Sequence, residues 1–435
     1  MATDSTAFHS HGTHPFVWLI GAGTVGRAIL CEFLRSGFEV LLIDASEDAL
    51  LLAEQEARRA FPDISLHRTV ACVNNLPALR FKGREKATLE EPSWPAIVLE
   101  SIPESLALKQ SLFEDLRKVM PAQTILASNT SNLRINDVFS PLGSDSRCCG
   151  LHFFMPVDKR PLIEFIATEF TSPSTQMACE AIARSLGKAI LLAADSPGFV
   201  VNRLLVPYLN QSLLMLERGV DANQLAEAAM HFGMPLSPLK LIDTIGIRTA
   251  FDSGRIFWQS FPDRLDPAPI LPGMIKAKRL GNVTGGGFFD SHALSPRDDE
   301  TSMKLNPLAL NPVALAVIAK YKRESHGWST EEVTQMIALP MWIEAAEVLA
   351  TGIVNELSDV ELAMRGGLGY DRPEGFFGYF EAMGRERLLT QIETYGATFR
   401  GLRASVELVE AIKQNASPNL AITQYAKRRQ NEVVP

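Results

Sequence analysis

Short apolar runs alternate with amphipathic stretches in the first part of the chain, and this alternation predicts strands and helices in turn. The first run, 16–20, is followed by a helical stretch and a second apolar run, 40–43. Ser46 then precedes two acids and a helical pattern, so we expect it to cap a helix. Further strand-type runs cover 96–99, 124–127, 150–154, 162–166 and 189–193, with helical patterns at 104–119 and 174–186 and no clear pattern at 62–95. This order predicts an α/β, doubly wound, mostly parallel sheet.

The pattern changes after Ser196-Pro197-Gly198, where the periodicity becomes helical and the chain repeats itself. In one copy Gly219 follows Pro207 by twelve residues, and in the other Gly352 follows Pro340 by the same spacing. Each copy continues into a second helical pattern and then a glycine. We therefore predict a disordered tail, 1–14, a sheet domain, 15–196, and two duplicated all-α domains, 197–310 and 311–435, joined through 290–328.

The turn after the first strand has the sequence Gly21-Ala22-Gly23-Thr24-Val25-Gly26. Its first glycine permits a tight turn, its second lets backbone amides approach a pyrophosphate, and its third lets the helix pack closely on the strand. Asp44 ends the second strand, where a carboxylate can accept hydrogen bonds from ribose hydroxyls and repel a 2′-phosphate. The stretch predicts a Rossmann-type NAD site. A βαβ unit without a ligand has the same outline.

Composition narrows the class of protein. A chain of 435 residues predicts two or three domains, and 46% hydrophobic with 21% charged residues is ordinary for a globular protein. A net charge of −8 argues against nucleic-acid binding. We find no apolar run near the roughly eighteen residues of a membrane span, and residues 1–15 lack the features of a signal peptide, so we expect a cytoplasmic protein without a membrane partner.

Metal binding is not expected from the cysteines and histidines. The cysteines lack C-x-x-C spacing and lie mostly in apolar segments, as reduced packing residues of cytosolic proteins do. Three histidines in the tail could hold a metal, but a disordered polar tail explains them more simply. These residues are Cys31, Cys72, Cys148, Cys149 and Cys179, and His9, His11 and His14.

Four motifs carry a family resemblance. They are Ser128-Asn129-Thr130-Ser131, Leu151-His152-Phe153-Phe154, Leu162-Ile163-Glu164 and Pro197-Gly198-Phe199-Val200-Val201-Asn202-Arg203-Leu204. Over roughly 17–378 the chain resembles L-3-hydroxyacyl-CoA dehydrogenases, and it is most similar to the dehydrogenase half of the bacterial multifunctional fatty-acid-oxidation α subunit. The resemblance implies NAD as cofactor and an acyl-CoA or related acyl thioester as substrate.

The resemblance gives His152 and Glu164 the acid/base roles. Oxidation of a secondary alcohol needs a base for the hydroxyl proton, and imidazole titrates in the right range. Glu164 would hold the imidazole tautomer and stabilise the imidazolium, as the acid of a catalytic triad does. A lone histidine in an apolar strand is otherwise a satisfied core residue.

Four further residues match polar positions of the family. Ser131 and Asn202 correspond to groups near the substrate oxygen, where buried donors support an alkoxide or enolate. Glu104 and Lys109 correspond to positions near the nicotinamide half of NAD. Taken alone, these residues are also explained as a turn residue, a capping amide and a solvated helix face.

Several positions depart from the family pattern. Met155 stands where an asparagine commonly contacts NAD, and Val283 where a lysine precedes Thr-Gly. The CoA-contacting serine and lysine fall near Ala60 and His67, and nearby cations could substitute for them: Arg58, Arg59 and Arg68. The departures affect cofactor affinity and CoA recognition and leave the acid/base pair intact.

The sequence therefore predicts NAD-dependent oxidation of L-3-hydroxyacyl-CoA to 3-oxoacyl-CoA, in a cleft between the Rossmann domain and the first helical domain. One alternative is a dehydrogenase of another 3-hydroxy acid or a carrier-bound acyl group. Another is a cofactor-binding subunit that has lost catalysis. The apolar helices of the duplicated domains either pack within one chain or build a homodimer.

Overall fold

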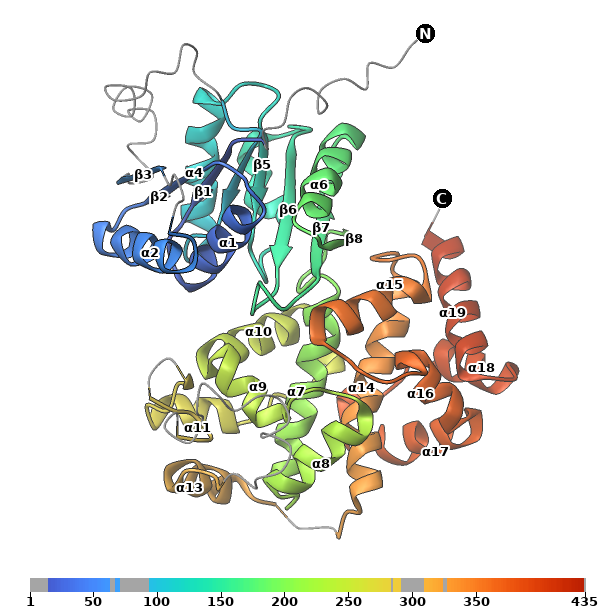
Figure 1. The fold of residues 1–435 in the computed structure, drawn as a ribbon. Helices are drawn as coiled ribbons and strands as arrows, with labels where there is room; N and C mark the ends of the chain where they lie inside the picture. The colour runs from blue at the N-terminus through green and yellow to red at the C-terminus, as the bar shows by residue number, and fades with distance from the viewer. Residues whose placement is uncertain are drawn as a thin grey trace. The chain divides into compact units, whose positions relative to one another are not determined.

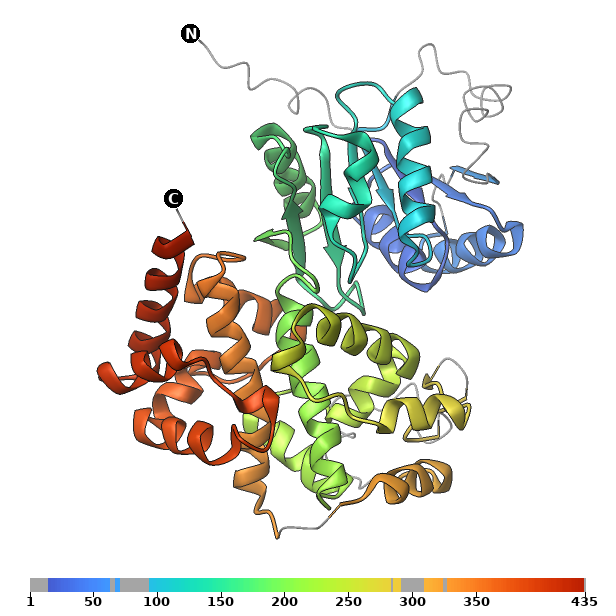
Figure 2. The ribbon, with the colours of Figure 1, turned by 180° about the vertical axis from the view of Figure 1, so that it is seen from behind.

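The computed structural model describes residues 15–62, 67–70, 94–282, 285–290, 309–323 and 327–433. The chain divides into two compact units, Met1–Asp195 and Ser196–Pro435. The predicted tail, with its three histidines, lies outside the described residues. The first unit carries the sheet and the second is helical (Figures 1 and 2).

Within its described residues, the first unit contains one sheet of eight strands in the order β3-β2-β1-β4-β5-β6-β7-β8. Neighbouring strands are parallel except β6 and β7, which are antiparallel. The predicted strands are confirmed, and β3 falls in the stretch 62–95, where no clear pattern was found. The strands are β1 (Val17–Ile20), β2 (Val40–Asp44), β3 (His67–Val70), β4 (Ile97–Glu100), β5 (Ile125–Ser128), β6 (Cys148–Phe153), β7 (Leu162–Ala167) and β8 (Ala189–Ala194).

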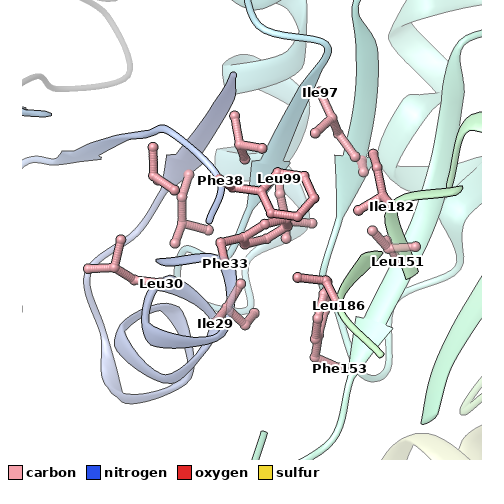
Figure 3. Close-up of a cluster of buried hydrophobic side chains, with 14 of the residues drawn as sticks. Ile29, Leu30, Phe33, Phe38, Ile97, Leu99, Leu151, Phe153, Ile182 and Leu186 are labelled. Atoms are coloured by element: carbon pink, nitrogen blue, oxygen red, sulfur yellow. The ribbon is translucent and has the colours of Figure 1, made fainter. Parts of the chain in front are cut away.

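Helices cover both faces of this sheet, α1 and α2 on one and α4 on the other (Figures 1 and 2). The core beneath α1 joins Ile29 and Phe33 to Leu99 of β4 and Leu151 of β6 (Figure 3). Ser46 caps α2 by accepting from the backbone N–H of Ala49 at 3.2 Å, as predicted. The helices are α1 (Thr24–Arg35), α2 (Glu47–Ala60), α4 (Leu106–Val119), α5 (Ile135–Phe139) and α6 (Pro173–Ser185).

The second unit is built from helices, of which α7 and α14 pack against each other. One of them, α13, lies in the stretch that we predicted only to join the two copies, so that stretch is partly helical. The helices are α7 (Val201–Glu217), α8 (Ala222–Phe232), α9 (Pro238–Ile245), α10 (Ile247–Ser260), α11 (Ile270–Lys276), α13 (Pro312–Tyr321), α14 (Thr330–Ala350), α15 (Leu357–Leu362), α16 (Gly375–Met383), α17 (Arg385–Tyr395), α18 (Val406–Gln414) and α19 (Pro418–Val433).

The helix order reflects the sequence repeat. Both α7 and α14 contain an internal proline and are followed by a glycine with positive φ, Gly219 at 90° and Gly352 at 68°. Later in each copy one glycine ends a helix and begins the next: Gly246 joins α9 to α10, and Gly384 joins α16 to α17. The second pair of glycines was not recognised in the sequence. The two copies share one compact unit.

Among the described residues, one helix, α14, has the length and apolar composition of a membrane span. Its apolar window is entirely buried in the structure, as in the core helix of a globular domain, so it is weak evidence for a membrane. Our prediction that no apolar run approaches this length is wrong for α14. Pro340, Glu344 and Glu347 interrupt the pattern, but the helix continues through all three.

A buried cluster of charges connects α7 to α14. Arg203 and Glu344 form an ion pair, and their side chains are 1% and 3% exposed. Arg264 bridges Glu344 at 3.4 Å and Glu347 at 2.7 Å. Burial raises the pKa of Glu344 and lowers that of Arg203, because each charge has left water. The cations come from the first copy of the repeat and the carboxylates from the second.

Candidate active site

The glycine turn connects β1 to α1, and its three glycines meet different constraints. Gly21 has a φ of 112°, and a Cβ there would lie 2.3 Å from the carbonyl oxygen of Ser101. A Cβ on Gly26 would lie 2.0 Å from the carbonyl oxygen of Gly21. A Cβ on Gly23 would meet nothing within 4 Å. The fold itself therefore needs Gly21 and Gly26, whereas Gly23 leaves open the space that a pyrophosphate needs.

The helix that follows, α1, begins at Thr24, and Val25 is its second residue. Its N-cap residue is Gly23, so no side chain caps the first backbone N–H groups. Asp44 lies beside this turn because β1 and β2 are parallel neighbours. Its carboxylate accepts from the backbone N–H of Ala22 at 2.7 Å and from that of Ser46 at 2.8 Å. The predicted acid and the predicted phosphate turn are thus in direct contact.

Gly23→Ala is expected to weaken NAD binding by about tenfold or more, because its methyl group would occupy the space that a pyrophosphate approaches. Its melting temperature should change little, since the position is open and its φ is −66°. The matched variant Gly26→Ala should instead lower the melting temperature by several degrees. Calorimetric titration with NAD and thermal unfolding measure the two effects. Unchanged NAD affinity in Gly23→Ala would contradict the assignment.

The acid/base candidates meet where β6 pairs with β7. The antiparallel register places His152 opposite Glu164, and Nδ1 lies 2.8 Å from Oε2. Both residues are buried, at 4% and 0% exposed. A carboxylate only accepts hydrogen bonds, so in the neutral imidazole Nδ1 carries the proton and Nε2 has the lone pair. Ser131, which follows β5, places its Oγ 3.1 Å from Nε2.

A second polar network lies at the ends of β4 and β5. Lys109 is 1% exposed, and its Nζ lies 2.5 Å from Glu100 and 3.4 Å from Glu104. Glu104 also accepts from the backbone N–H of Ser131 at 3.2 Å and from the Thr130 hydroxyl at 2.6 Å. The network therefore reaches the residue that contacts His152. Glu100 was not among the predicted site residues, although a carboxylate at the end of a central strand was an available signal.

Comparison with known sequences assigns the family. Residues 17–196 match the model described as the NAD binding domain of 3-hydroxyacyl-CoA dehydrogenase, and residues 198–291 match that of its C-terminal domain. The chain belongs to the 3-hydroxyacyl-CoA dehydrogenase family. Its cofactor is NAD, as the glycine turn and Asp44 predicted.

The relatives of the chain include larger proteins. It is 28% identical over 389 residues to the glyoxysomal fatty acid beta-oxidation multifunctional protein MFP-a of Brassica napus, covering 88% of this chain and 52% of that protein. It is 29% identical over 367 residues to the fatty acid oxidation complex subunit alpha of Acinetobacter baumannii, covering 83% and 50%. The chain spans about half the length of these relatives.

A solved structure agrees with the fold. The 3-hydroxybutyryl-CoA dehydrogenase of Escherichia coli K12 matches with a TM-score of 0.70 and 22% identity, covering 96% of this chain and 99% of that one. At this identity the match supports the architecture alone. The present chain therefore shares its architecture, an α/β domain followed by a helical part, with a solved dehydrogenase.

The other predicted site residues belong to other elements of the chain. Met155 follows β6 and is 44% exposed. Asn202 is the second residue of α7 and belongs to the helical unit. Ala60 ends α2, where Arg58 pairs with Glu54 at 2.9 Å. Val283 and the side chains of His67 and Arg68 lie outside the described residues.

Cysteines in the described part of the chain are free, and three of them are buried. Cys149 and Cys179 approach to 3.9 Å between their Sγ atoms inside the core of the sheet unit. They pack as the sequence predicted. No group of three metal-ligating side chains occurs among the residues that the structure describes.

Proposed function

We propose that this chain oxidises the 3-hydroxyl group of L-3-hydroxyacyl-CoA to the 3-oxo group. When bound, NAD supplies the acceptor for the hydride that leaves C3. The observation that carries the proposal is the buried contact of His152 with Glu164, with Ser131 at the other imidazole nitrogen. That arrangement leaves Nε2 able to take the proton of the substrate hydroxyl.

Each polar residue has a separate part in this proposal. Glu164 fixes the tautomer of His152 and stabilises the imidazolium after proton transfer. Ser131 offers a hydroxyl to the substrate oxygen, and Glu104 holds the Ser131 backbone in place. Asn202 is proposed as a second polar partner of that oxygen, on the strength of its family motif.

The domain organisation and assembly form part of the proposal. We assign 15–196 to the NAD-binding domain, and 197–310 and 311–435 to two copies of one helical domain that share a compact unit. We also propose a cytoplasmic homodimer. The Brassica napus relative is named as glyoxysomal, so imaging of the tagged chain is the test of its location. Light scattering of the purified protein tests whether it is a dimer.

Absorbance at the NADH band, followed over a panel of hydroxy substrates, tests the proposed activity. NADH formation with L-3-hydroxyacyl-CoA supports it. Activity only with another 3-hydroxy acid or a carrier-bound acyl group would assign the chain to a related dehydrogenase, which the departure near Ala60, at a CoA-contacting position of the family, favours. Cofactor binding without turnover on any donor would indicate a subunit that has lost catalysis.

Met155→Asn is expected to tighten NAD binding several-fold, because an amide would restore a hydrogen bond worth on the order of 1 kcal/mol. The exposed thioether lies two residues after the end of the strand that carries His152, and it offers no comparable donor. Substrate preference should not change. Dissociation constants for NAD and substrate in both proteins measure the effect. Unchanged NAD affinity with weakened substrate binding would show that Met155 instead belongs to the acyl pocket.

A further inference from the structure

Glu100 is a fully buried carboxylate at the carboxyl end of β4, between β1 and β5 at the centre of the sheet. Its Oε1 accepts from the backbone N–H of Ile102 at 2.7 Å and from Lys109 at 2.5 Å. Its Oε2 accepts from the Ser128 hydroxyl at 2.6 Å. A carboxylate removed from water in this way is stable only with such partners, so its charge is built into the site.

Lys109 provides the matching cation, and its position depends on Glu100. Its Nζ lies 2.5 Å from Glu100, 3.3 Å from the carbonyl oxygen of Ile102 and 3.4 Å from Glu104. Glu104 is the more exposed acid, at 37%. Together the two acids and the lysine carry one net negative charge. Glu100 and Lys109 are the buried members of this group, and Glu104 accepts a hydrogen bond from the Ser131 backbone.

The proposed function places this charge near the reacting end of the cofactor. In the proposed reaction the base takes the proton of the hydroxyl group on C3 while a hydride leaves C3 itself, so the nicotinamide ring would come close to His152 and Ser131. Glu104 contacts Ser131 directly, and Lys109 contacts Glu104. The oxidised nicotinamide ring is positively charged and the reduced ring is neutral. A net negative charge here therefore favours the oxidised cofactor over the reduced one.

We propose that Glu100 is a positioning residue that acts through Lys109. It holds the ammonium group of Lys109 and cancels its positive charge. The preference of the site for NAD+ over NADH is therefore greater than it would be without Glu100. The inference rests on the proposed function, because that function places the nicotinamide at this network. It gives the buried carboxylate a role in cofactor redox preference in addition to its role in packing.

Glu100→Gln keeps the shape of the side chain and removes its charge. The ratio of the NAD+ to the NADH dissociation constant should rise by about 5-fold or more, the effect of one unit charge across a partly desolvated site. Lys109→Met removes the cation and should lower the same ratio. The double variant restores the original net charge, so its ratio should return close to that of the wild type. A loss of packing alone would weaken both cofactors equally and give no reversal of sign.

A matched control is available in the same unit. Glu32 and Lys188 form another buried pair, with Oε1 and Nζ at 3.0 Å and side chains 8% and 4% exposed. Glu32→Gln should leave the ratio unchanged even if it lowers the melting temperature. The full chain is titrated with NAD+ and with NADH by calorimetry, and thermal unfolding checks each variant.

Two results would overturn the inference: equal weakening of NAD+ and NADH in Glu100→Gln, or a rise of the ratio in Lys109→Met. If Glu100→Gln does not fold, Lys109→Met still decides the sign. The test needs binding and no turnover, so it is separate from the substrate panel. Normal turnover with an unchanged ratio rejects only the role of Glu100, whereas a shifted ratio without turnover rejects only the proposed activity.

Discussion

Replacing His152 with alanine is expected to lower kcat with L-3-hydroxyacyl-CoA by about 10²–10⁴-fold, the usual contribution of a general base. NAD binding should be nearly intact, because the proposed cofactor contacts of the glycine turn and Asp44 lie between β1 and α1 and on β2, and not on the strand that carries His152. Steady-state kinetics and calorimetric titration with NAD measure the two quantities. A near-normal rate would reject His152 as the base.

Glu164→Gln isolates the charge behind the base. The variant keeps the size of a side chain that is 0% exposed, but it no longer requires a proton on Nδ1 and does not stabilise the imidazolium. We expect kcat to fall by about 10²-fold or more. The control is His231→Ala, which removes a histidine near the end of α8 in the helical unit and should leave kcat unchanged. Equal losses in both variants would point to general destabilisation.

Glu344→Ala is expected to destabilise the helical unit by about 3–5 kcal/mol, because it leaves a buried guanidinium without its partner. Arg203 has its side chain 1% exposed, and it also donates to the Ser196 hydroxyl at 3.0 Å. Glu347 would keep its contacts with Arg264 and with the Tyr425 hydroxyl, both at 2.7 Å. Denaturant unfolding followed by circular dichroism at a helical wavelength measures the loss.

The double variant Arg203→Met, Glu344→Leu serves as the control for this cluster. Replacing both charges with apolar groups of similar size removes the cost of an unpaired charge, so much of the lost stability should return. A destabilisation below about 1 kcal/mol in Glu344→Ala, the scale of an ordinary surface change, would show that the pair does not hold the two copies together.

The sequence determined those features that depend on neighbouring residues. The alternation of apolar and polar positions specified the strands and helices of the sheet unit. An element that is buried on one face needs apolar residues at the spacing of that face, which differs between a helix and a strand. The glycine turn and Asp44 were recognisable since each residue meets a local backbone or charge requirement. The proline and glycine spacing similarly revealed the repeat, and the motif around His152 indicated the candidate base.

Tertiary structure decided which distant residues face one another. The antiparallel pairing of β6 with β7 selects Glu164 as the partner of His152, and a register shifted by one residue would turn Glu164 to the other face. Glu100 ends a strand in the sequence, and in the folded chain its buried carboxylate forms an ion pair with Lys109. Folding also brings Arg203 to Glu344 across 141 residues. Such pairs form because a charge removed from water needs a partner, and only the packed fold brings that partner within reach.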